Sequence, residues 1–532
     1  MQDTAAKEII FKNESQQMLA QGVDTLANAV KVTMGPGGEN VIIESPGGPP
    51  ILTKDGVTVA KAIALSLPFQ NMGVQTVKEA ASKTAETAGD GTTTATVITQ
   101  ALINKGQKLV AAGHNSVKLR EGIKAATIAV ANEIKASSQP VENNDDIINV
   151  GTISANGDVQ IGKFLADAMD HVGRDGVITV DEARGFDTSL EIVDGFELNR
   201  GFISPYFITN QAKGMVEFVQ PKILLVNKRI TSIQDLVPLL ESARRQSDNL
   251  LIIADDVEGD ALKVCVLNVL KGILNLCIIR APAFGAMRAE ALNDLALLFN
   301  TRVYTQGETL PADVSELGSC EKFTGFRNSS IFVGTASSNT DEVQERLNTV
   351  IEFNNHPGIT SQEKAYLQRR QAVLSGGIAV IRVGGSTDLE LRERKDRIDD
   401  AVCATRAAAR GGIVDGGGFA LLNASKKVTS QQSEVTDQDF VAGWNLLLEA
   451  ITMPAQQIAM NAGYVPEIIL AKSEETPGLG FDARTGTWVN LKENGIIDPM
   501  LVVESALTHA SSAALNLLSV GCAIVDEAEN KK

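Results

Sequence analysis

The segment AGDGTTTAT, residues 88–96, is the densest chemical signal in this chain of 532 residues. Its two glycines allow the backbone to approach a ligand closely, and Asp90 and three threonines stand where a predicted helix begins. Backbone N–H groups and the helix dipole attract phosphates at such a start, hydroxyls bind phosphate oxygens, and a carboxylate holds magnesium. The segment therefore favours a phosphate and magnesium site, while ordinary N-capping by Asp90 or Thr92 is the alternative interpretation.

Helical patterns flank this segment on both sides. Apolar residues recur at helical spacing over residues 18–32, 74–88 and 117–136, and the first of these helices is expected to stop at Gly35 and Pro36. Two short β-rich runs, residues 40–43 and 51–53, are separated by a Pro- and Gly-rich turn and predict a hairpin. The first section of the chain is thus expected to be mostly helical.

The predicted secondary structure changes in the centre of the chain. Short helices and strands are predicted from about residue 141 to 193, and beyond them strands alternate with helices up to Gly377. Residues 222–226, 250–254 and 276–279 are continuous apolar runs, which suit a sheet covered on both faces. A charged helix follows, and Ala- and Leu-rich helices then return. We therefore expect one discontinuous helical domain interrupted by inserted α/β domains.

Three further glycine-rich loops are candidates for nucleotide contacts. Residues 33–38, TMGPGG, offer backbone amides that could wrap a nucleotide, although Gly-Pro-Gly also ends helices. Residues 53–56, TKDG, close the predicted hairpin, for which a plain turn is the alternative. Residues 415–418, DGGG, follow a helix that contains Asp399 and Asp400; they could approach a ribose or base, and a linker would look the same.

Composition and charge exclude several classes of protein. Apolar residues make up 44% and charged residues 21%, as in globular proteins, and the 4% of aromatic residues implies helices packed through small side chains. The formal charge of −17 argues against binding to nucleic acid or to an anionic membrane. The five cysteines show no metal-binding or disulfide spacing, and the N-terminus lacks a signal pattern. A cytoplasmic protein is expected.

The commonest ATP-binding and hydrolase motifs are missing from the sequence. No Walker A pattern occurs, and no kinase-type loop is paired with Asp-Phe-Gly, so any ATP site is of another kind. The four histidines lie far apart without a nucleophile motif, which disfavours a serine or cysteine hydrolase.

In this order, the motifs resemble those of the group I (GroEL-type) chaperonins, and the resemblance spans nearly the whole chain. The segments that carry it are residues 30–36, 53–57, 88–96, 150–156, 200–207, 404–408 and 495–499. The resemblance implies a multi-domain α/β, GroEL-like fold with a mostly helical equatorial domain, a small α+β intermediate domain and an α/β apical domain. The implied boundaries are 1–136 and 412–532 (equatorial), 137–193 and 378–411 (intermediate), and 194–377 (apical).

The resemblance also implies an ATPase that uses Mg²⁺ and K⁺. It makes Asp400 the base that activates the attacking water, assisted by Asp55, and it gives Mg²⁺ to Asp90 and K⁺ to Thr33, Lys54 and Thr93. The nucleotide-binding residues that it implies are Thr33, Met34, Gly35, Pro36, Lys54, Asp90, Gly91, Thr92, Thr93, Thr94, Gly417, Asp482, Ala483 and Asp498.

Apolar residues at helical spacing in the central region have two interpretations. Taken without the resemblance, they are core faces. In the family, the matching positions form an exposed groove that binds non-native polypeptides and the mobile loop of a co-chaperonin. These positions are Phe202, Tyr206, Phe207, Val237, Leu240, Leu262, Val266 and Leu267. The assembly that the resemblance implies is a homo-oligomeric, seven-membered ring, either single or double.

This chain departs from the family pattern at several positions. Asp415 replaces a small apolar residue before the glycine triplet, residues 481–483 differ at the expected adenine contact, and residues 464–466 replace charged residues expected between back-to-back rings. Two other functions remain as alternatives. One is an ATP-independent holdase or scaffold with the same fold, and the other is a small-molecule phosphotransferase, for which the sequence shows no acceptor-site signature.

Overall fold

The computed structural model describes residues 7–44, 50–155, 157–173, 176–183, 186–211, 213–335, 340–354, 361–385, 387–429 and 437–526. The chain divides into two compact units. The first unit comprises residues 1–167, 180–189 and 382–532, and the second comprises residues 168–179 and 190–381. Both ends of the chain therefore belong to one unit, as the helical texture at the two ends predicted. The finer division into three domains stays a prediction.

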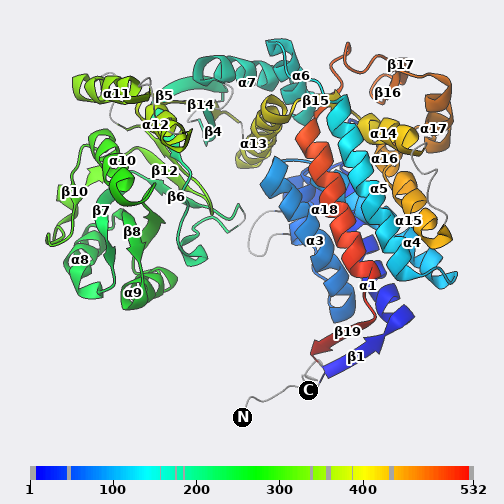
Figure 1. Cartoon of the computed structure of the whole chain (residues 1–532), viewed down its shortest axis with the longest axis horizontal. Coiled ribbons are helices and arrows are strands. Elements are labelled where there is room, and N and C mark those ends of the chain that lie inside the picture. Colours follow the sequence, from blue (N-terminus) through cyan, green and yellow to red (C-terminus); the bar gives the residue numbers. More distant parts are fainter. Residues whose placement is uncertain are drawn as a thin grey trace. The chain divides into compact units, whose positions relative to one another are not determined.

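The first unit is mostly helical, and its longest helices lie side by side around α18 (Figure 1). Its core combines the apolar faces of α1, α3, α4, α5, α15 and α18. The elements of its N-terminal part are β1 (Lys7–Phe11), α1 (Lys12–Lys31), β2 (Val41–Ile43), β3 (Ile51–Thr53), α2 (Gly56–Ala62), α3 (Pro68–Ala88), α4 (Thr92–Ala111), α5 (Ser116–Ser137) and α6 (Asn144–Ser154). The elements of its C-terminal part are α13 (Asp388–Gly411), β15 (Ile413–Asp415), α14 (Phe419–Thr429), α15 (Gln438–Ala450), α16 (Met453–Asn461), α17 (Pro466–Glu475), β16 (Gly480–Asp482), β17 (Thr487–Val489), β18 (Ile497–Pro499), α18 (Met500–Leu518) and β19 (Cys522–Asp526).

Pairs of helices in this unit approach closely at glycines. A Cβ on Gly22 of α1 would lie 1.9 Å from the carbonyl oxygen of Gln70 on α3, and one on Gly73 of α3 would lie 2.1 Å from that of Leu19. Helices α5 and α15 cross in the same way, at Gly122 and Gly443. Any larger residue would push these helices apart, so the small-residue packing expected from the low aromatic content is confirmed.

Short strand pairs complete the first unit. The two chain ends form an antiparallel ribbon in which β1 pairs with β19, from Lys7 opposite Asp526 to Phe11 opposite Cys522. Figure 1 shows this ribbon beside the labelled chain ends. The predicted hairpin is present as β2 paired with β3. Strands β15 and β18 pair with Val414 opposite Asp498, which brings residues far apart in sequence next to each other.

The second unit contains a parallel sheet, as the continuous apolar runs predicted. Strands β7, β8 and β9 are parallel neighbours, and their central residues are fully buried between the helices of this unit. The elements that lie wholly in this unit are β6 (Val216–Val219), β7 (Lys222–Ile230), α8 (Val237–Gln246), β8 (Asn249–Val257), α9 (Gly259–Leu270), β9 (Asn275–Arg280), α10 (Gly285–Leu298), β10 (Val303–Tyr304), β11 (Gly318–Ser319), β12 (Lys322–Gly325), β13 (Ser330–Val333), α11 (Asp341–Asn354) and α12 (Ser361–Leu374).

A second sheet has the strand order β4-β14-β5-β13-β12-β6, in which β5, β13, β12 and β6 pair antiparallel. Four elements contain the boundaries between the two units along the chain: α7 (Val159–Val172), β4 (Val177–Glu182), β5 (Ser189–Leu198) and β14 (Gly377–Val383). A stack of phenylalanines that includes Phe196, Phe299 and Phe332 fills the core beside this sheet, with ring centroids 5.0–5.7 Å apart. The mixed multi-domain α/β class expected from the sequence is confirmed.

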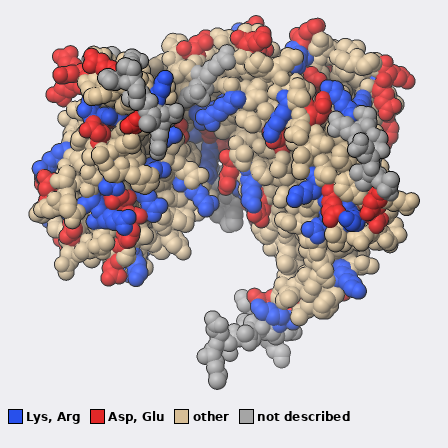
Figure 2. Space-filling model, viewed as in Figure 1, with Lys and Arg blue, Asp and Glu red and all other residues tan. Residues whose placement is uncertain are grey.

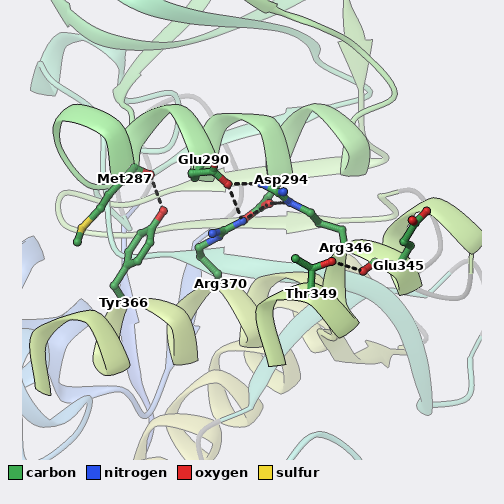
Figure 3. A network of polar contacts seen from close by, with 8 residues as sticks. All are labelled: Met287, Glu290, Asp294, Glu345, Arg346, Thr349, Tyr366 and Arg370. Carbon is green, nitrogen blue, oxygen red and sulfur yellow. Dashed lines mark hydrogen bonds and ion pairs between the residues drawn. The ribbon is translucent and has the colours of Figure 1, made fainter. Parts of the chain in front are cut away.

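A buried ion-pair network ties α11 and α12 to α10 (Figure 3). The Asp294 carboxylate, 2% exposed, accepts hydrogen bonds from Nε of Arg346 at 2.8 Å and from Nε of Arg370 at 2.6 Å. Nη2 of Arg370 donates a third at 2.8 Å, and the Tyr366 hydroxyl donates to the Met287 carbonyl oxygen at 2.5 Å. The buried negative charge is thus matched by two guanidinium groups.

Candidate functional site

The predicted phosphate loop lies between α3 and α4. Gly89 and Gly91 both have left-handed backbone angles, φ +75° and +87°, and they turn the chain so that Asp90 stands immediately before α4. Gly91 is the N-cap residue, and no side chain caps the helix. The alternative of ordinary capping by Asp90 or Thr92 is therefore wrong, and the first-turn N–H groups of α4 remain available to an anion.

A pocket opens at this helix start. Five of the predicted nucleotide-binding or metal-binding residues line it or lie in its wall: Met34, Asp90, Gly91, Thr94 and Asp498. The remaining lining residues are Gly418, Ala420, Leu421, Pro454, Ile458, Pro499, Val502 and Val503. The pocket thus combines one anion-attracting end with a mostly apolar wall, which is the usual character of a small-molecule site.

The loop after α1 forms one side of the pocket. Nδ2 of Asn461 donates hydrogen bonds to the carbonyl oxygens of Lys31 at 2.8 Å and Met34 at 2.9 Å, which holds the loop against α16. A Cβ on Gly35 would lie 3.0 Å from Cγ2 of Ile458, so the backbone passes close to the pocket wall there. The Thr33 hydroxyl is buried and donates to the Val30 carbonyl oxygen at 2.8 Å.

Three carboxylates from separate segments act on one another electrostatically. Burial raises the pKa of Asp400 on α13 well above its ordinary value, and the negative charges of Asp55 and Asp90 raise it further. Burial likewise raises the pKa of Asp90, and a hydrogen bond from the Gly91 N–H at 2.5 Å opposes this effect. Such mutual repulsion is typical of a site that binds cations or protonates one member.

Asp55 also has a local structural role. Its carboxylate caps α2 by accepting hydrogen bonds from the backbone N–H groups of Val57 at 2.9 Å and Thr58 at 2.8 Å. Next to it, a Cβ on Gly56 would lie 2.2 Å from Oγ1 of Thr93 and 3.4 Å from Oγ1 of Thr92. The turn of residues 53–56 therefore lies against the threonines that begin α4.

The glycine triplet packs beside Asp498 on β18. The Gly417 N–H donates a hydrogen bond to Asp498, and Gly418 lines the pocket. Burial is the main cause that raises the pKa of Asp498 to about 7, and the charges of Asp90 and Asp415 add to it. Asp415 itself accepts a hydrogen bond from Nδ2 of Asn423 at 3.2 Å.

Several predicted residues lie outside the pocket lining. Oδ1 and Oδ2 of Asp482 bind the Arg484 N–H and the Thr485 hydroxyl within the turn after β16, and Ala483 packs on the apolar cluster around Phe419. Lys54, Pro36 and Gly35 do not line it either, although Gly35 contacts one of its walls. The structure therefore brings the phosphate-side residues and Asp498 together at the pocket. Lys54 lies in the turn beside Thr92 and Thr93 without lining the pocket, and Asp482 does not line it either.

The structure also brings in residues that sequence reasoning missed. The Ser154 hydroxyl of α6 donates a hydrogen bond to Oδ2 of Asp90 at 3.4 Å. Ser154 belongs to the segment 150–156, which carries the family resemblance but predicts no role for this residue. Pro454, Ile458, Val502 and Val503 form the apolar wall. No signal in the sequence distinguishes these four from ordinary core residues of helices, because only the fold shows which of them face a pocket.

The eight predicted polypeptide-binding residues divide by burial within the second unit. Tyr206, Val237 and Leu267 are exposed, at 59%, 39% and 52%, and Leu262 and Val266 are half-buried. The other three positions, Phe202, Phe207 and Leu240, are buried in the core. Among these eight positions, only the first five are accessible in this conformation.

Two kinds of feature are missing from the part of the chain that the structure describes. No helix there is both long enough and apolar enough to cross a membrane. No group of three or more Asp, Glu, His or Cys side chains in that part is arranged to hold a metal ion by itself.

Comparisons with known proteins point in one direction. The model of the TCP-1/cpn60 chaperonin family matches residues 26–528. Among solved structures, the chaperonin gp146 from bacteriophage EL 2 (Pseudomonas aeruginosa), crystallised in the presence of ATP-BeFx, is similar in two crystal forms, with TM-scores of 0.69 and 0.63. In both, the sequence identity is 23%, and the match covers 98% of this chain and 99% of the phage chain. At this identity, the structural match supports the fold.

Proposed function

The chain belongs to the TCP-1/cpn60 chaperonin family, and from this membership we propose that it is a subunit of an ATP-dependent chaperonin. It captures non-native polypeptides on an apolar surface and promotes their folding in a ring cavity, through cycles of ATP binding and hydrolysis. The observation that carries the proposal is the pocket at the uncapped start of α4, next to the carboxylates of Asp55, Asp90 and Asp400.

The phosphates of ATP fit the start of α4. The free N–H groups of its first turn and the hydroxyls of Thr92, Thr93 and Thr94 offer donors to phosphate oxygens. Mg²⁺ commonly binds through one or two carboxylates together with substrate phosphates and water. A single carboxylate, Asp90, at the edge of the pocket fits that manner of binding, and bound Mg²⁺ would neutralise phosphate charge.

The remaining nucleotide contacts are assigned by position. Asp498, which lines the pocket, and Gly417, which donates a hydrogen bond to Asp498, are the proposed ribose contacts. Residues 33–36 are the proposed contacts from the loop after α1, of which Met34 lines the pocket. Asp482 and Ala483 are the proposed adenine contacts. K⁺ is proposed at Thr33, Lys54 and Thr93; the Thr33 hydroxyl already donates its proton to Val30, so its oxygen lone pairs are free to accept a cation.

Asp400 is the proposed general base. It arrives on a separate helix, α13, near the phosphate loop, and the neighbouring Asp55 and Asp90 increase its affinity for a proton. A base whose pKa is raised toward neutrality accepts a proton from water more readily than an ordinary aspartate. Asp55 assists by orienting the same water, from a carboxylate that its cap of α2 holds rigidly.

The assembly and its partners extend the proposal. In this proposal, the chain consists of equatorial, intermediate and apical domains with the boundaries that the resemblance implies. The subunits assemble into a homo-oligomeric, seven-membered ring in the cytoplasm. Non-native polypeptides bind the apical surface around Tyr206, Val237 and Leu267, whose exposed apolar side chains suit non-directional capture. The same surface is the proposed binding site of a co-chaperonin.

Steady-state ATP hydrolysis and nucleotide binding test the proposal. Wild-type protein is expected to hydrolyse ATP only with Mg²⁺. Asp400→Asn is expected to lower kcat by roughly 10²-fold or more, with the Kd of ATP nearly unchanged, because the base acts only in the chemical step. Asp399→Asn removes one charge from the adjacent position and serves as the matched control. Normal turnover by Asp400→Asn would refute its role, and an inactive wild-type protein would refute the ATPase.

Two other functions predict different outcomes. An ATP-independent holdase would prevent aggregation of unfolded protein equally well with and without ATP. A phosphotransferase would consume ATP faster when its acceptor substrate is supplied. The carboxylates gathered near one phosphate-binding helix start favour hydrolysis over the first alternative.

A further inference from the structure

A direct contact joins the phosphate loop to the helix that carries Asp400. A Cβ on Gly89 would lie 2.1 Å from Cβ of Cys403 and 2.9 Å from its Sγ. Carbon atoms in favourable contact are about 3.5–4.0 Å apart. The Cys403 side chain therefore occupies the space that a side chain at position 89 would need, and the loop and α13 touch without clearance.

The contact lies on the same face of α13 as the proposed base. Asp400 precedes Cys403 by three residues and Ala407 follows it by four, and residues at these spacings share one helix face. Ala407 is buried in a small cluster with Ala88 and Val502, which continues the contact along the helix. The Asp400 side of α13 is thus the side that rests on the loop.

Cys403 contributes volume to this contact without adding charge. Burial raises the pKa of its thiol to about 12, and the charges of Asp400 and Asp399 raise it in the same direction. The thiol is therefore neutral near pH 7 and a poor nucleophile. Its size is the property that bears on the distance between α13 and the loop.

We propose that Cys403 is a positioning residue for ATP hydrolysis, whose side chain is the spacer that sets how far Asp400 lies from Asp90 and the pocket. This inference rests on the proposed function of Asp400. A longer side chain at position 403 would displace α13 from the loop and carry Asp400 away from the bound phosphates. A displacement of about 1 Å can reduce turnover by as much as roughly 10²-fold.

The affinity for ATP distinguishes a displaced α13 from a general loss of structure, because a general loss of structure would weaken ATP binding as well. Met34, Pro454 and Ile458 line the pocket from elements other than α13. A shift of α13 should leave these walls in place. Enlarging position 403 is therefore expected to lower kcat while the Kd of ATP stays within about twofold.

The first experiment compares Cys403→Leu, Cys403→Ser and wild type by kcat, by KM and by the calorimetric Kd of ATP. Cys403→Leu is expected to lose on the order of 10–10²-fold in kcat with an unchanged Kd. Cys403→Ser, which keeps the size, is expected to keep most of the turnover. Cys320→Leu enlarges a buried thiol of the other unit and is the control, with normal kcat expected. Equal kcat for Cys403→Leu and wild type overturns the inference.

A compensating pair keeps the proposal falsifiable if a single variant folds poorly. Gly89→Ala places a methyl group in the contact and also strains a left-handed residue, so it should lower kcat. Adding Cys403→Gly removes the opposing side chain while the strain remains, and kcat should recover at least severalfold. No recovery would overturn the spacer role. Wild-type protein without ATP hydrolysis would instead refute the proposed function, on which the spacer role depends.

Discussion

At the scale of single residues, Asp498 shows how the fold changes the chemistry of a carboxylate. It sits on β18 beside the glycine triplet, and its sequence context, GIIDP, gives no hint of an unusual proton affinity. Burial and the charges of Asp90 and Asp415 raise its pKa to about 7, against a hydrogen bond from Gly417 that lowers it. In the unfolded chain the same group titrates near pH 4.

This shift predicts a pH-dependent stability of the nucleotide-free protein. Between about pH 4 and pH 7 the folded state holds a proton that the unfolded state has released, so the stability due to Asp498 falls as the pH rises through this window. The Asp498→Asn side chain is neutral at every pH, so the variant does not undergo this fall in stability. We expect the variant to be more stable than wild type by about 2 kcal/mol at pH 8, and by much less near pH 4.

Urea unfolding between pH 4 and pH 8 measures this difference. Glu79→Gln, an exposed carboxylate of α3, is the matched control and should show no comparable trend. A constant difference between Asp498→Asn and wild type at all pH values would show that the fold does not raise this pKa.

The sequence alone predicted part of the candidate site. Asp90, Gly91 and Thr94 could be found because two glycines, a carboxylate and hydroxyls at a helix start form a pattern within a few residues. Asp400 and Asp498 have no such local pattern, and their place in the site followed from the family resemblance. The Gly89 to Cys403 contact could not be predicted, because it joins residues more than three hundred positions apart.

At the scale of elements, the ion-pair network shows how α12 is held. Asp294 of α10 receives two arginines, one from α11 and one from α12, in a nearly water-free position (Figure 3). A charge buried in this way is stable only while its partners remain. Glu290 of α10, which is about half exposed, also pairs with both arginines, so two carboxylates of α10 hold these helices and only Asp294 among them is buried.

Removal of the buried charge of Asp294 is expected to loosen both helices. Asp294→Asn leaves two guanidinium groups without their buried partner, and we expect about 3 kcal/mol or more of lost protection for α11 and α12. Hydrogen exchange measured by mass spectrometry on peptides of these helices reports the change. Glu79→Gln, which breaks an exposed ion pair with Lys83, should change little. Unaltered exchange in Asp294→Asn would contradict the structural role of the network.

Most elements could be predicted from their periodicity, and their ends less well. The helix expected over residues 18–32 begins already at Lys12, since its first turns carry polar residues that hide the pattern. The hairpin β2–β3 and the parallel strands β7 to β9 are where the sequence placed them. The pairing of β1 with β19 was missed, because each strand is short and its partner lies at the other end of the chain.

At the scale of the whole molecule, the surface carries both interspersed charges and exposed apolar side chains. Lys and Arg side chains are interspersed among Asp and Glu on the face drawn in Figure 2, although the chain carries a net charge of −17. Exposed apolar side chains in the second unit include Val237 at the start of α8 and Leu267 on α9. Repulsion between like-charged copies of a chain opposes non-specific association through exposed apolar residues of this kind.

Polar substitution of these residues tests the capture of unfolded protein. Val237→Ser combined with Leu267→Ser removes apolar contacts worth about 1 kcal/mol each, so capture should weaken by roughly 30-fold. Suppression of aggregation of a chemically unfolded protein is the measurement, and ATP hydrolysis should be unaffected. Val219→Ser, at an exposed position on β6 of the same unit, is the control. Undiminished capture by the double variant would place the binding surface elsewhere.

The ribbon formed by β1 and β19 has a consequence for biosynthesis. The first unit needs residues from both ends of the chain, whereas nearly all of the second comes from the continuous stretch 190–381. During translation, α1 therefore leaves the ribosome long before α18 and β19 are synthesised. Until then, the apolar face of α1 lacks the residues that bury it in the folded protein. Contacts of such high sequence separation form slowly. A chaperone subunit would therefore itself remain partly folded for a prolonged time during synthesis. Its second unit would complete its fold before the first, ATP-binding unit could do so.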